Sequence, residues 1–354
     1  MMRSIFLICL CLIPGLVSAA NHCVILQYHH FSDTTPASTS VTPAQFADQL
    51  EYLSHNGFTV MALRDVALSL YHQLELPDKC VSLTVDDAYL SVYQNAYPLV
   101  RKYQWPLSIF VSSDHVADDS SLYMSWAQLR EMQQHGVSIE NHSKSHVHLI
   151  RQQTGETEQQ WLARIRHDIL HSQQEITRQT GVTPQLFAWP YGEYNTALGN
   201  LLRELGLTGF GQQSGPAWTD ANFAALPRFP MADRFADLEG FIIKVNTLPL
   251  PLVRATPEDP VLDPANVRPT LTLTLAPEKY AKSNLRCYIG GSDQVTLHWS
   301  EQSAHTLEVS PQFDLTPGRH RSNCTMPSNQ KGRFHWYSHN WIVPNADGSW
   351  YDEN

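Results

Sequence analysis

From residue 23 to about residue 250, short runs of alternating apolar residues recur between amphipathic stretches. Segments 42–57 and 125–136 have an apolar face at helical spacing. Each begins with a hydroxyl residue that can cap a helix and ends with glycine. Strand–helix alternation of this kind predicts an α/β fold with a mostly parallel sheet and helices outside it. The strands are expected at residues 23–27, 81–85, 107–111, 137–140 and 186–189.

The pattern changes after residue 250. Six prolines between residues 249 and 269 predict a stiff, extended connector. Beyond it, short alternating segments separated by turn residues predict a small β-sandwich. Its aromatic segment 334–343 could form a sugar platform, but we favour a packing role. We therefore expect an export signal at 1–20, an α/β domain at 21–250, a Pro-rich linker at 251–269 and a small β-sandwich domain at 270–354.

The first twenty residues resemble a secretory signal peptide. Arg3 supplies the positive charge, residues 5–13 form a short apolar core, and residues 17–19 (Val-Ser-Ala) fit a cleavage site for small residues. The apolar run is too short to span a bilayer, and no later segment is long and apolar enough. We expect an exported protein, periplasmic or secreted, with no transmembrane segment after cleavage.

Four cysteines remain beyond this signal. An even number in an exported chain indicates disulfides, and the sequence alone permits three pairings. We favour Cys23–Cys80, because each residue opens a predicted strand, and Cys287–Cys324, because both lie in the C-terminal segment. Buried free thiols are the alternative.

Composition narrows the class of partner. A chain of 354 residues with 42% hydrophobic and 16% charged residues is typical of a globular protein with one large and one small domain. The formal net charge of -10 argues against a nucleic acid or an anionic membrane as partner.

Two adjacent carboxylates, Asp86 and Asp87, directly follow the strand predicted at 81–85, where their mutual repulsion calls for a cation. About fifty residues downstream, His142 and His146 follow another predicted strand at a spacing that lets two imidazoles hold one ion. Two histidines, one aspartate and an open position are typical of catalytic zinc sites. We predict Asp87, His142 and His146 as ligands of a divalent metal, most simply Zn²⁺, with Co²⁺ or Ni²⁺ as alternatives. Asp86 is then free to accept a proton from an attacking water.

A third motif is the aromatic turn in residues 187–195, "FAWPYGEYN". Pro190 and Gly192 favour a tight turn, so the backbone N–H of Tyr191 can point outward as an oxyanion donor. Alone, each of the three motifs has a simpler interpretation as a solvated turn, a surface coincidence or a packed aromatic turn. Their combination after predicted strands is far more specific.

The three motifs, in this order, resemble those of the polysaccharide deacetylases, the NodB-homology group or carbohydrate esterase family 4. That family carries T-F-D-D-G, H-[ST]-x-x-H and R-x-P-[YF]-G, and the matching residues here are 84–88, 142–146 and 188–192. The resemblance covers roughly residues 24–245. It implies a distorted (β/α) barrel and metal-dependent removal of acetyl groups from N-acetylated sugars. It also implies that Asp86 is the base and that the Tyr191 amide helps to bind the oxyanion.

The sequence departs from this family pattern in three places. Ala88 stands where the family has glycine, which would cost about 1 kcal/mol if the backbone has a positive φ there. Ala188 replaces the arginine that steadies the catalytic aspartate, and Arg228 is a remote candidate to substitute for it. The Leu-x-His motif that carries the family's acid-side histidine is absent near the end of the domain.

Two of these features resemble the branch that deacetylates poly-β-1,6-N-acetylglucosamine: a Trp-Pro-Tyr-Gly motif without arginine and an early "QYHHF". That branch supplies its acid-side histidine from the first strand, where the matching residue is His29. A structural hydrogen bond is the alternative role for His29. The residues expected to contact substrate are Tyr28, Trp189, Pro190 and Tyr191.

The sequence therefore predicts an exported, metal-dependent hydrolase of carbon–nitrogen bonds that removes acetyl groups from an N-acetylglucosamine polymer. Its partner would be this N-acetylated glycan. The alternatives are deacetylation of peptidoglycan, chitin oligomers or O-acetyl esters, and a non-catalytic relative that only binds glycan.

Overall fold

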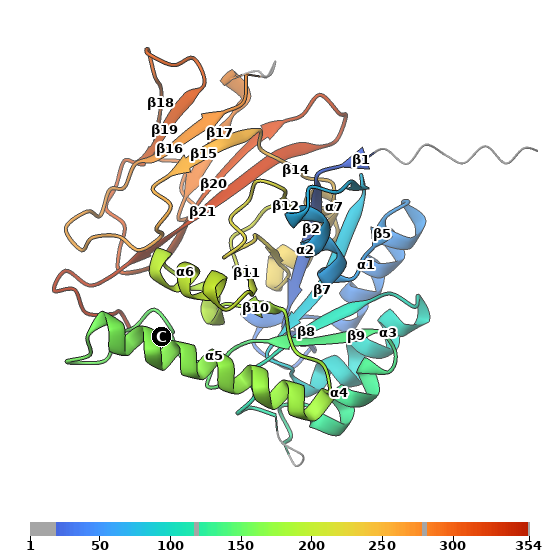
Figure 1. The fold of residues 1–354 in the computed structure, drawn as a ribbon. Helices are drawn as coiled ribbons and strands as arrows, with labels where there is room; N and C mark the ends of the chain where they lie inside the picture. The colour runs from blue at the N-terminus through green and yellow to red at the C-terminus, as the bar shows by residue number, and fades with distance from the viewer. Residues whose placement is uncertain (1–18, 117–119, 278–281, 353–354) are drawn as a thin grey trace, which may run out of the picture.

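The computed structural model describes residues 19–116, 120–277 and 282–352. A curled sheet with helices on its outer side forms the first part, and two smaller sheets stacked on each other form the second (Figure 1). The predicted α/β class and the following all-β part are both confirmed. The helices are α1 (Pro43–His55), α2 (Leu63–Tyr71), α3 (Tyr97–Lys102), α4 (Trp126–Gln133), α5 (Glu158–Thr180), α6 (Thr196–Glu204) and α7 (Leu238–Val245).

The large sheet has the strand order β11-β10-β9-β8-β7-β2-β12, with β13 beside β2 and β5 beside β7. All its pairings are parallel except that of β12 with β2. Every residue of β2 and β7 is buried, as expected for strands covered on both faces. The strands are β2 (His22–Tyr28), β5 (Thr59–Val60), β7 (Cys80–Asp86), β8 (Leu107–Val111), β9 (Val137–Asn141), β10 (Leu186–Ala188), β11 (Thr208–Phe210), β12 (Ala217–Trp218) and β13 (Phe229–Pro230).

The sheet curls into a half-barrel, and segment 223–230 connects its two edges. At one end the backbone N–H groups of Gly209, in β11, and Gly211, directly after it, donate to the carbonyls of Phe223 and Leu226. At the other end β13 pairs with β2. The expected distorted barrel is confirmed as a half-barrel, and the connecting segment carries a buried arginine, Arg228.

The helices begin where the sequence indicates. Thr42, Ser125 and Thr157 cap α1, α4 and α5, and each forms a reciprocal capping box with the glutamine three residues later. Helix α5 ends at Gly181, which has a left-handed backbone (φ 74°). Local signals therefore determine the ends of these helices.

Two four-stranded sheets form the C-terminal sandwich, around a shared apolar core that includes Leu273, Leu307 and Trp341. Trp341 is fully buried, which supports a packing role for the aromatic segment 334–343. One sheet contains β14 (Leu248–Pro249), β21 (Phe334–Val343), β20 (Gly318–Pro327) and β17 (Arg286–Ile289), and the other contains β15 (Leu252–Thr256), β16 (Leu271–Leu275), β19 (Thr306–Pro311) and β18 (Val295–Trp299).

The segment predicted as a Pro-rich linker is not a simple connector. Residues Leu252–Thr256 form β15, which pairs antiparallel with β16. Pro251 and Pro257 stand just outside β15, where a missing N–H does not interrupt the ladder. We therefore propose that the sandwich begins near residue 248 rather than at residue 270.

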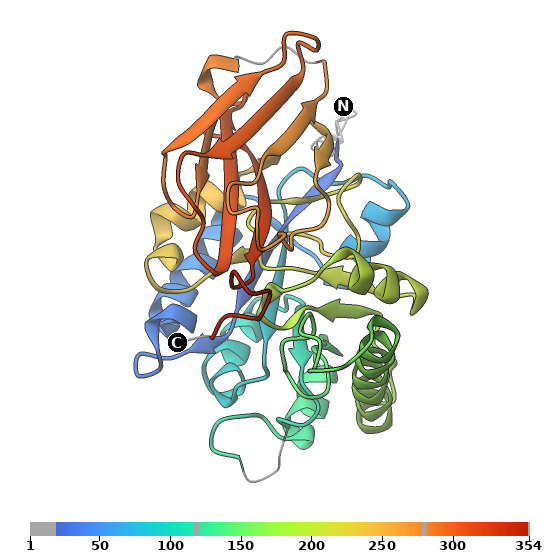
Figure 2. The ribbon, with the colours of Figure 1, turned by 90° about the vertical axis from the view of Figure 1, so that its left-hand side faces the viewer.

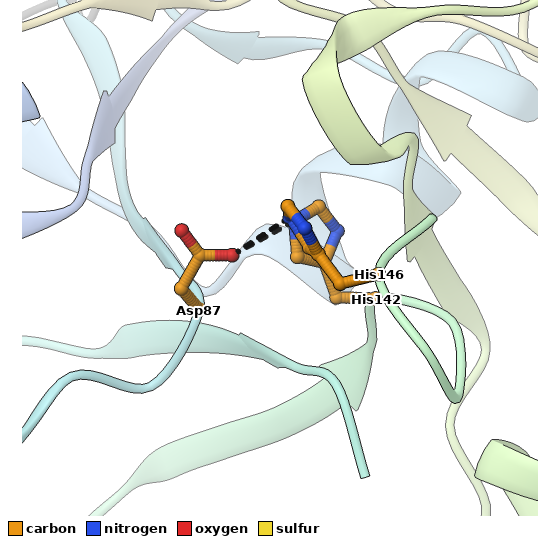
Figure 3. Close-up of side chains that lie close together, drawn as sticks. All are labelled: Asp87, His142 and His146. Atoms are coloured by element: carbon orange, nitrogen blue, oxygen red, sulfur yellow. Dashed lines mark ion pairs between the residues drawn. The ribbon is translucent and has the colours of Figure 1, made fainter. Parts of the chain in front are cut away.

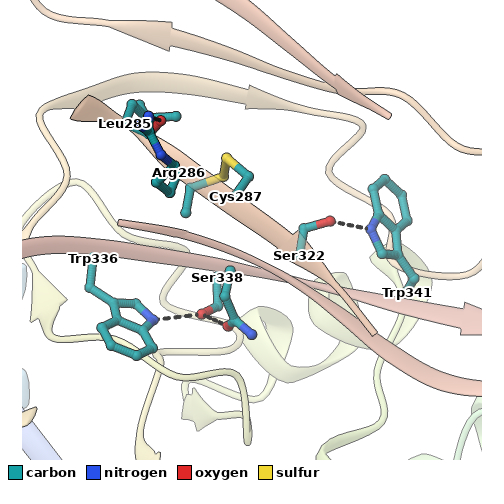
Figure 4. Close-up of a disulfide and its surroundings, with 9 residues drawn as sticks. Leu285, Arg286, Cys287, Ser322, Trp336, Ser338 and Trp341 are labelled. Atoms are coloured by element: carbon teal, nitrogen blue, oxygen red, sulfur yellow. Dashed lines mark hydrogen bonds between the residues drawn. A yellow bond between two sulfur atoms is a disulfide. The ribbon is translucent and has the colours of Figure 1, made fainter. Parts of the chain in front are cut away.

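Both expected disulfides are present. Cys23–Cys80 connects the neighbouring strands β2 and β7, and Cys287–Cys324 connects directly opposed residues of β17 and β20. Figure 4 shows the second disulfide near Trp341, whose indole N–H donates to Ser322 Oγ at 2.7 Å. Each disulfide therefore joins two adjacent strands of one sheet.

Most of the predicted export signal lies outside the described residues. Its last two residues, Ala19–Ala20, form the short strand β1, which pairs with β6 (Leu76–Pro77). Of the helices that the structure describes, none combines the length and apolarity needed to cross a membrane.

The sandwich packs directly against the half-barrel (Figure 2). The Trp336 ring of β21 contacts the Phe229 ring of β13, and Arg333 Nη1 donates to both carboxylate oxygens of Asp78 at 2.7 and 2.9 Å. After β21 the chain returns along the half-barrel, where Tyr351 joins an apolar cluster with Trp161 of α5. The two parts therefore share a continuous interface.

Candidate active site

The polar motifs meet because the parallel strands β2, β7, β9 and β10 end at the same edge of the half-barrel. Residues at this edge come from four separate stretches of sequence. The residues that directly follow these four strands are His29, Asp87, His142 and Trp189.

Asp87, His142 and His146 converge on one point. The Nε2 atoms of His142 and His146 lie 3.3 and 3.0 Å from Asp87 Oδ1, and one ligand atom from each residue lies within 4.8 Å of the others (Figure 3). His142 Nδ1 lies 2.7 Å from the Ala188 carbonyl oxygen, an interaction that directs Nε2 toward Asp87. The structure therefore brings together all three residues predicted as metal ligands.

The donor set fits a divalent ion. Asp87 Oδ1 is buried and lacks a hydrogen bond of good geometry within the part of the chain that the structure describes. Burial alone would raise the pKa of Asp87, but the facing imidazoles of His142 and His146 hold it well below its ordinary value. A buried anion with an unsatisfied oxygen, facing two nitrogens, is the arrangement that a bound cation stabilises.

Asp86 is fully buried beside this cluster and carries a bidentate ion pair. Arg228 Nη1 donates to Oδ1 at 2.7 Å and Nη2 to Oδ2 at 2.8 Å, while Gln27 Nε2 donates to Oδ2 at 2.6 Å. Burial raises the pKa of Asp86, but the Arg228 guanidinium lowers it by more than burial raises it. The pKa of Asp86 is therefore below its ordinary value. Arg228 thus supplies the cation that Ala188 cannot, as the sequence suggested.

Arg228 is itself fully buried in segment 223–230. Its Nε donates to the Gly211 carbonyl at 2.9 Å, and its guanidinium lies over the Phe110 ring at 5.3 Å from the centroid. Contacts other than that with Asp86 therefore also hold the guanidinium in place. The segment that connects the sheet edges also orients the proposed base.

Strained backbone is concentrated at this edge. The structure describes eight non-glycine residues with positive φ, and five of them lie in the three motifs. At Ala88, φ is 55°, so the expected cost of about 1 kcal/mol applies there. Such strain persists where surrounding contacts orient functional groups. The five residues are Asp87, Ala88, Ser143, His146 and Tyr191.

The Pro190–Gly192 turn lies next to the metal cluster. Tyr191 has φ 60°, its ring centroid is 4.8 Å from that of His146, and its hydroxyl donates to the His146 carbonyl at 3.2 Å. Gly192 has φ 70°, and a Cβ there would lie 2.7 Å from Gln212 Cβ. Only glycine fits at this position, so the predicted tight turn has a steric basis.

His29 lies close enough to Asp86 and Asp87 for their charges to affect its pKa. Burial lowers the pKa of its imidazole, and the carboxylates of Asp87 and Asp86 oppose that shift. The structure therefore places the residue predicted as the acid beside the proposed base and metal ligands.

Residues 73–210 match the family model described as polysaccharide deacetylase. The chain contains a polysaccharide deacetylase domain. YxkH of Bacillus subtilis, whose name marks it as an inferred polysaccharide deacetylase, is 28% identical over 207 residues, which are 58% of this chain and 69% of YxkH. The poly-β-1,6-N-acetyl-D-glucosamine N-deacetylase of Staphylococcus aureus is 25% identical over 61% of this chain and 76% of its own length. The Escherichia coli enzyme of the same name is also 25% identical, but the match spans only 37% of its length.

Solved structures of deacetylases are similar to this chain. The Streptococcus pyogenes deacetylase PplD, in complex with acetate, has a TM-score of 0.57 and 23% identity over 63% of this chain and 98% of its own. IcaB from Ammonifex degensii has a TM-score of 0.52 and 23% identity over 59% of this chain and 92% of its own. At this identity the likeness establishes the fold. The family match and the relatives named as N-deacetylases confirm the prediction of a hydrolase of this type.

The deacetylase domain does not expose all the predicted substrate contacts. Tyr28 is 1% exposed and donates its hydroxyl to Gln49 Oε1 at 2.8 Å, while Trp189 is fully buried and donates its indole N–H to the Ala224 carbonyl at 2.7 Å. Pro190 is buried as well. These three side chains are buried in the described structure and do not present a surface to substrate, whereas Tyr191 is partly exposed.

A row of rings, of which the sequence predicted only His146 and Tyr191 as site residues, lies beside the candidate metal cluster. Tyr89 stacks on His30 at 3.6 Å and on Tyr123 at 5.2 Å between ring centroids, and His115 stacks on Tyr123 at 4.8 Å. Tyr89 directly follows the Asp-Asp-Ala motif and could have been suspected, whereas Tyr123 lies in a loop without any signal. We call the following residues the aromatic row: His30, Tyr89, Tyr123, His115, His146, Tyr191 and His148.

Proposed function

We propose that this protein is an exported, metal-dependent deacetylase that hydrolyses acetamide groups of a poly-N-acetylglucosamine-like polysaccharide. The observation that carries the proposal is the Asp87–His142–His146 cluster beside the buried Asp86–Arg228 pair. One carboxylate faces the two imidazoles while its neighbour is held ionised by arginine. This division of roles is what metal-assisted hydrolysis requires.

In this proposal, a divalent ion held by Asp87, His142 and His146 would lower the pKa of a water and polarise the acetamide carbonyl. Asp86 accepts the proton of the attacking water, a step that general-base catalysis typically accelerates by about 10² to 10⁴. The Tyr191 backbone N–H donates to the carbonyl oxygen as negative charge develops on it. His29 donates a proton to the leaving amine, so that acetate and a free glucosamine unit are released.

Three features support an N-acetylated glycan as substrate. Aromatic rings stack on sugar faces, and the aromatic row presents several partly exposed rings beside the cluster. Relatives in Staphylococcus aureus and Escherichia coli are named for poly-β-1,6-N-acetyl-D-glucosamine. The net charge of -10 is compatible with a polymer that becomes cationic on deacetylation.

Export is supported by the two disulfides and the N-terminal sequence pattern.

The deciding experiment measures acetate released by the purified chain from poly-β-1,6-N-acetylglucosamine, peptidoglycan, chitin oligomers and an O-acetylated glycan. We expect release from the first polymer, loss of release with a chelator, and recovery when Zn²⁺, Co²⁺ or Ni²⁺ is added. Faster release from another substrate would replace the proposed polymer. Binding of glycan without acetate release from any of them would favour a non-catalytic relative.

A further inference from the structure

One contact of the Tyr191 turn comes from the C-terminal sandwich. Arg319, on β20, donates from Nη1 to the Tyr191 carbonyl oxygen at 2.8 Å, across a sequence separation of 128 residues. The same guanidinium lies over the Tyr191 ring, 5.6 Å from its centroid. One arginine therefore holds both the backbone and the side chain of the residue proposed to bind the oxyanion.

A second connection reaches the turn through Glu193, which is 1% exposed. Its Oε1 accepts from the hydroxyl of Tyr351, in the segment after β21, at 2.6 Å, and its Oε2 is paired with His148 Nδ1 at 2.7 Å. The His148 ring in turn stacks on the Tyr191 ring, with centroids 3.9 Å apart and planes at 10°. The Tyr191 ring thus contacts both His148 and Arg319.

The turn needs such support because its conformation is unfavourable. Tyr191 has φ 60°, which a residue with a side chain adopts only when its surroundings impose it. Within the turn, the Gly192 N–H donates to the Trp189 carbonyl at 2.9 Å and the Glu193 N–H to the Pro190 carbonyl at 3.2 Å. The donor to the next carbonyl, that of Tyr191, comes from the sandwich. The Tyr191 N–H belongs to the preceding peptide and is related to this carbonyl by the backbone angles of Tyr191. A change in these angles would therefore alter the direction of the N–H relative to the site.

We propose that the C-terminal sandwich completes the deacetylase site, with Arg319 as a positioning residue that holds the Tyr191 backbone in the conformation that directs its N–H toward the oxyanion. Glu193 and Tyr351 act with it by fixing the His148 ring against Tyr191. The role of the turn rests on the proposed function. The sandwich is then a working part of the active site as well as a packed neighbour.

Kinetics of Arg319→Met test this role. Because a small misplacement of a catalytic group can cost up to about 10²-fold, we expect kcat to fall about tenfold or more, with KM and bound metal per chain unchanged. Arg319→Lys should recover part of the activity, because an ammonium can still donate to the Tyr191 carbonyl. Arg268→Met is the matched control: it removes another sandwich arginine, which pairs with Asp314 on the exposed surface, and it should behave like the unmodified protein.

Tyr351→Phe keeps the ring in its apolar cluster and removes only the hydroxyl that donates to Glu193. It should lower kcat in the same direction as Arg319→Met, by a smaller factor. A wild-type kcat in both Arg319→Met and Tyr351→Phe, or a loss explained by released metal, would overturn the positioning role.

Hydrogen exchange separates this inference from the proposed function, because it needs no turnover. In the full-length protein, the amides of residues 189 and 191–193 should exchange faster in Arg319→Met than in Arg268→Met, while exchange in β7 stays unchanged. Equal exchange in the two variants would overturn the inference even if the enzyme is active. Absence of acetate release by the unmodified protein would instead sink the proposed function, and faster exchange would still establish that Arg319 holds the turn.

Discussion

Asp86 illustrates how a single residue acquires its role from its surroundings. It is fully buried, a setting that by itself favours a neutral carboxyl group, yet Arg228 and Gln27 donate three hydrogen bonds to its two oxygens. Its neighbour Asp87 faces two imidazoles instead. The two adjacent aspartates therefore have different proposed roles because their side chains have different partners.

The substitution Asp86→Asn should reduce acetate release by about 10²- to 10⁴-fold, because the amide cannot accept the water proton. Metal content should stay unchanged, because the three proposed ligands remain. Asp114→Asn is a suitable control, since Asp114 is a half-exposed acid that pairs with Lys144 near the site. Equal loss of activity in the two variants, measured by acetate release and metal analysis, would exclude Asp86 as the base.

The substitution Arg228→Met should destabilise the fold by about 3–5 kcal/mol, because it leaves the Asp86 carboxylate buried without its cation. Urea unfolding measures this loss. Arg166→Met, which breaks a surface pair with Glu204, should cost no more than about 1 kcal/mol. In the double variant Arg228→Met/Asp86→Asn the cost should be smaller than the sum of the single costs, and simple additivity would contradict the coupling.

At the scale of elements, the site depends on where strands end and how the loops turn after them. Strands β7 and β9 end directly before Asp87 and His142, and β10 is followed by the Tyr191 turn. Left-handed backbone in each loop directs side chains back over the edge of the sheet. A change in one of these backbone angles would therefore displace a functional group.

Two glycines offer a matched test of this dependence. Gly181 and Gly192 have similar positive φ values of 74° and 70°, but a Cβ at Gly181 meets nothing within 4 Å, whereas at Gly192 it meets Gln212 at 2.7 Å. Gly181→Ala should cost about 1 kcal/mol and leave activity intact. Gly192→Ala should cost more and should also lower kcat, because the turn must shift. Thermal unfolding and acetate release measure both effects, and similar results for the two variants would argue against a sterically fixed turn.

At the scale of the whole molecule, the interface between half-barrel and sandwich includes contacts to the Tyr191 turn and between buried polar groups. Arg333, directly before β21, pairs with Asp78 in the half-barrel, and Asn340 Nδ2 donates to Gln213 Oε1 at 3.2 Å. Because these contacts join distant parts of the chain, we expect the two parts to unfold together.

Two buried histidines near this interface predict the dependence of stability on pH. Burial lowers the pKa of His22 and of His339 from 6.5 to about 4. Above pH 6.5 both are neutral in either state. As the pH falls from 6.5 towards 4, the unfolded chain binds protons that the folded one does not, so stability is lost. Each shift corresponds to roughly 3 kcal/mol at most.

We therefore expect the unfolding temperature to fall between pH 7 and pH 4.5. His339→Phe should reduce this slope, because a phenyl ring does not titrate and can keep the contact with the Trp341 ring. His55→Phe is the control, since His55 is largely exposed and should leave the slope unchanged. Identical slopes in all three proteins would show that the buried His339 does not contribute.

The sequence alone was sufficient for features that depend on neighbours along the chain. Strand positions follow from apolar alternation, helix starts from capping residues, and the three motifs directly follow or overlap the ends of their strands. Because parallel strands end at one edge, placing Asp87 and His142 after strands already predicted that they would meet. The pairing Cys23–Cys80 followed in the same way from the starts of two strands.

Only the tertiary structure decided the features that depend on how the sheet curls and what covers it. The bidentate pairing of Arg228 with Asp86 spans 142 residues, and sequence reasoning could name Arg228 only as a candidate. The contact of Arg319 with Tyr191, and the burial of Tyr28 and Trp189, had no signal in the sequence. Local patterns specify which atoms are present at a strand end, whereas the packing of remote segments determines which of those atoms face the site, what charge they carry and what holds them there.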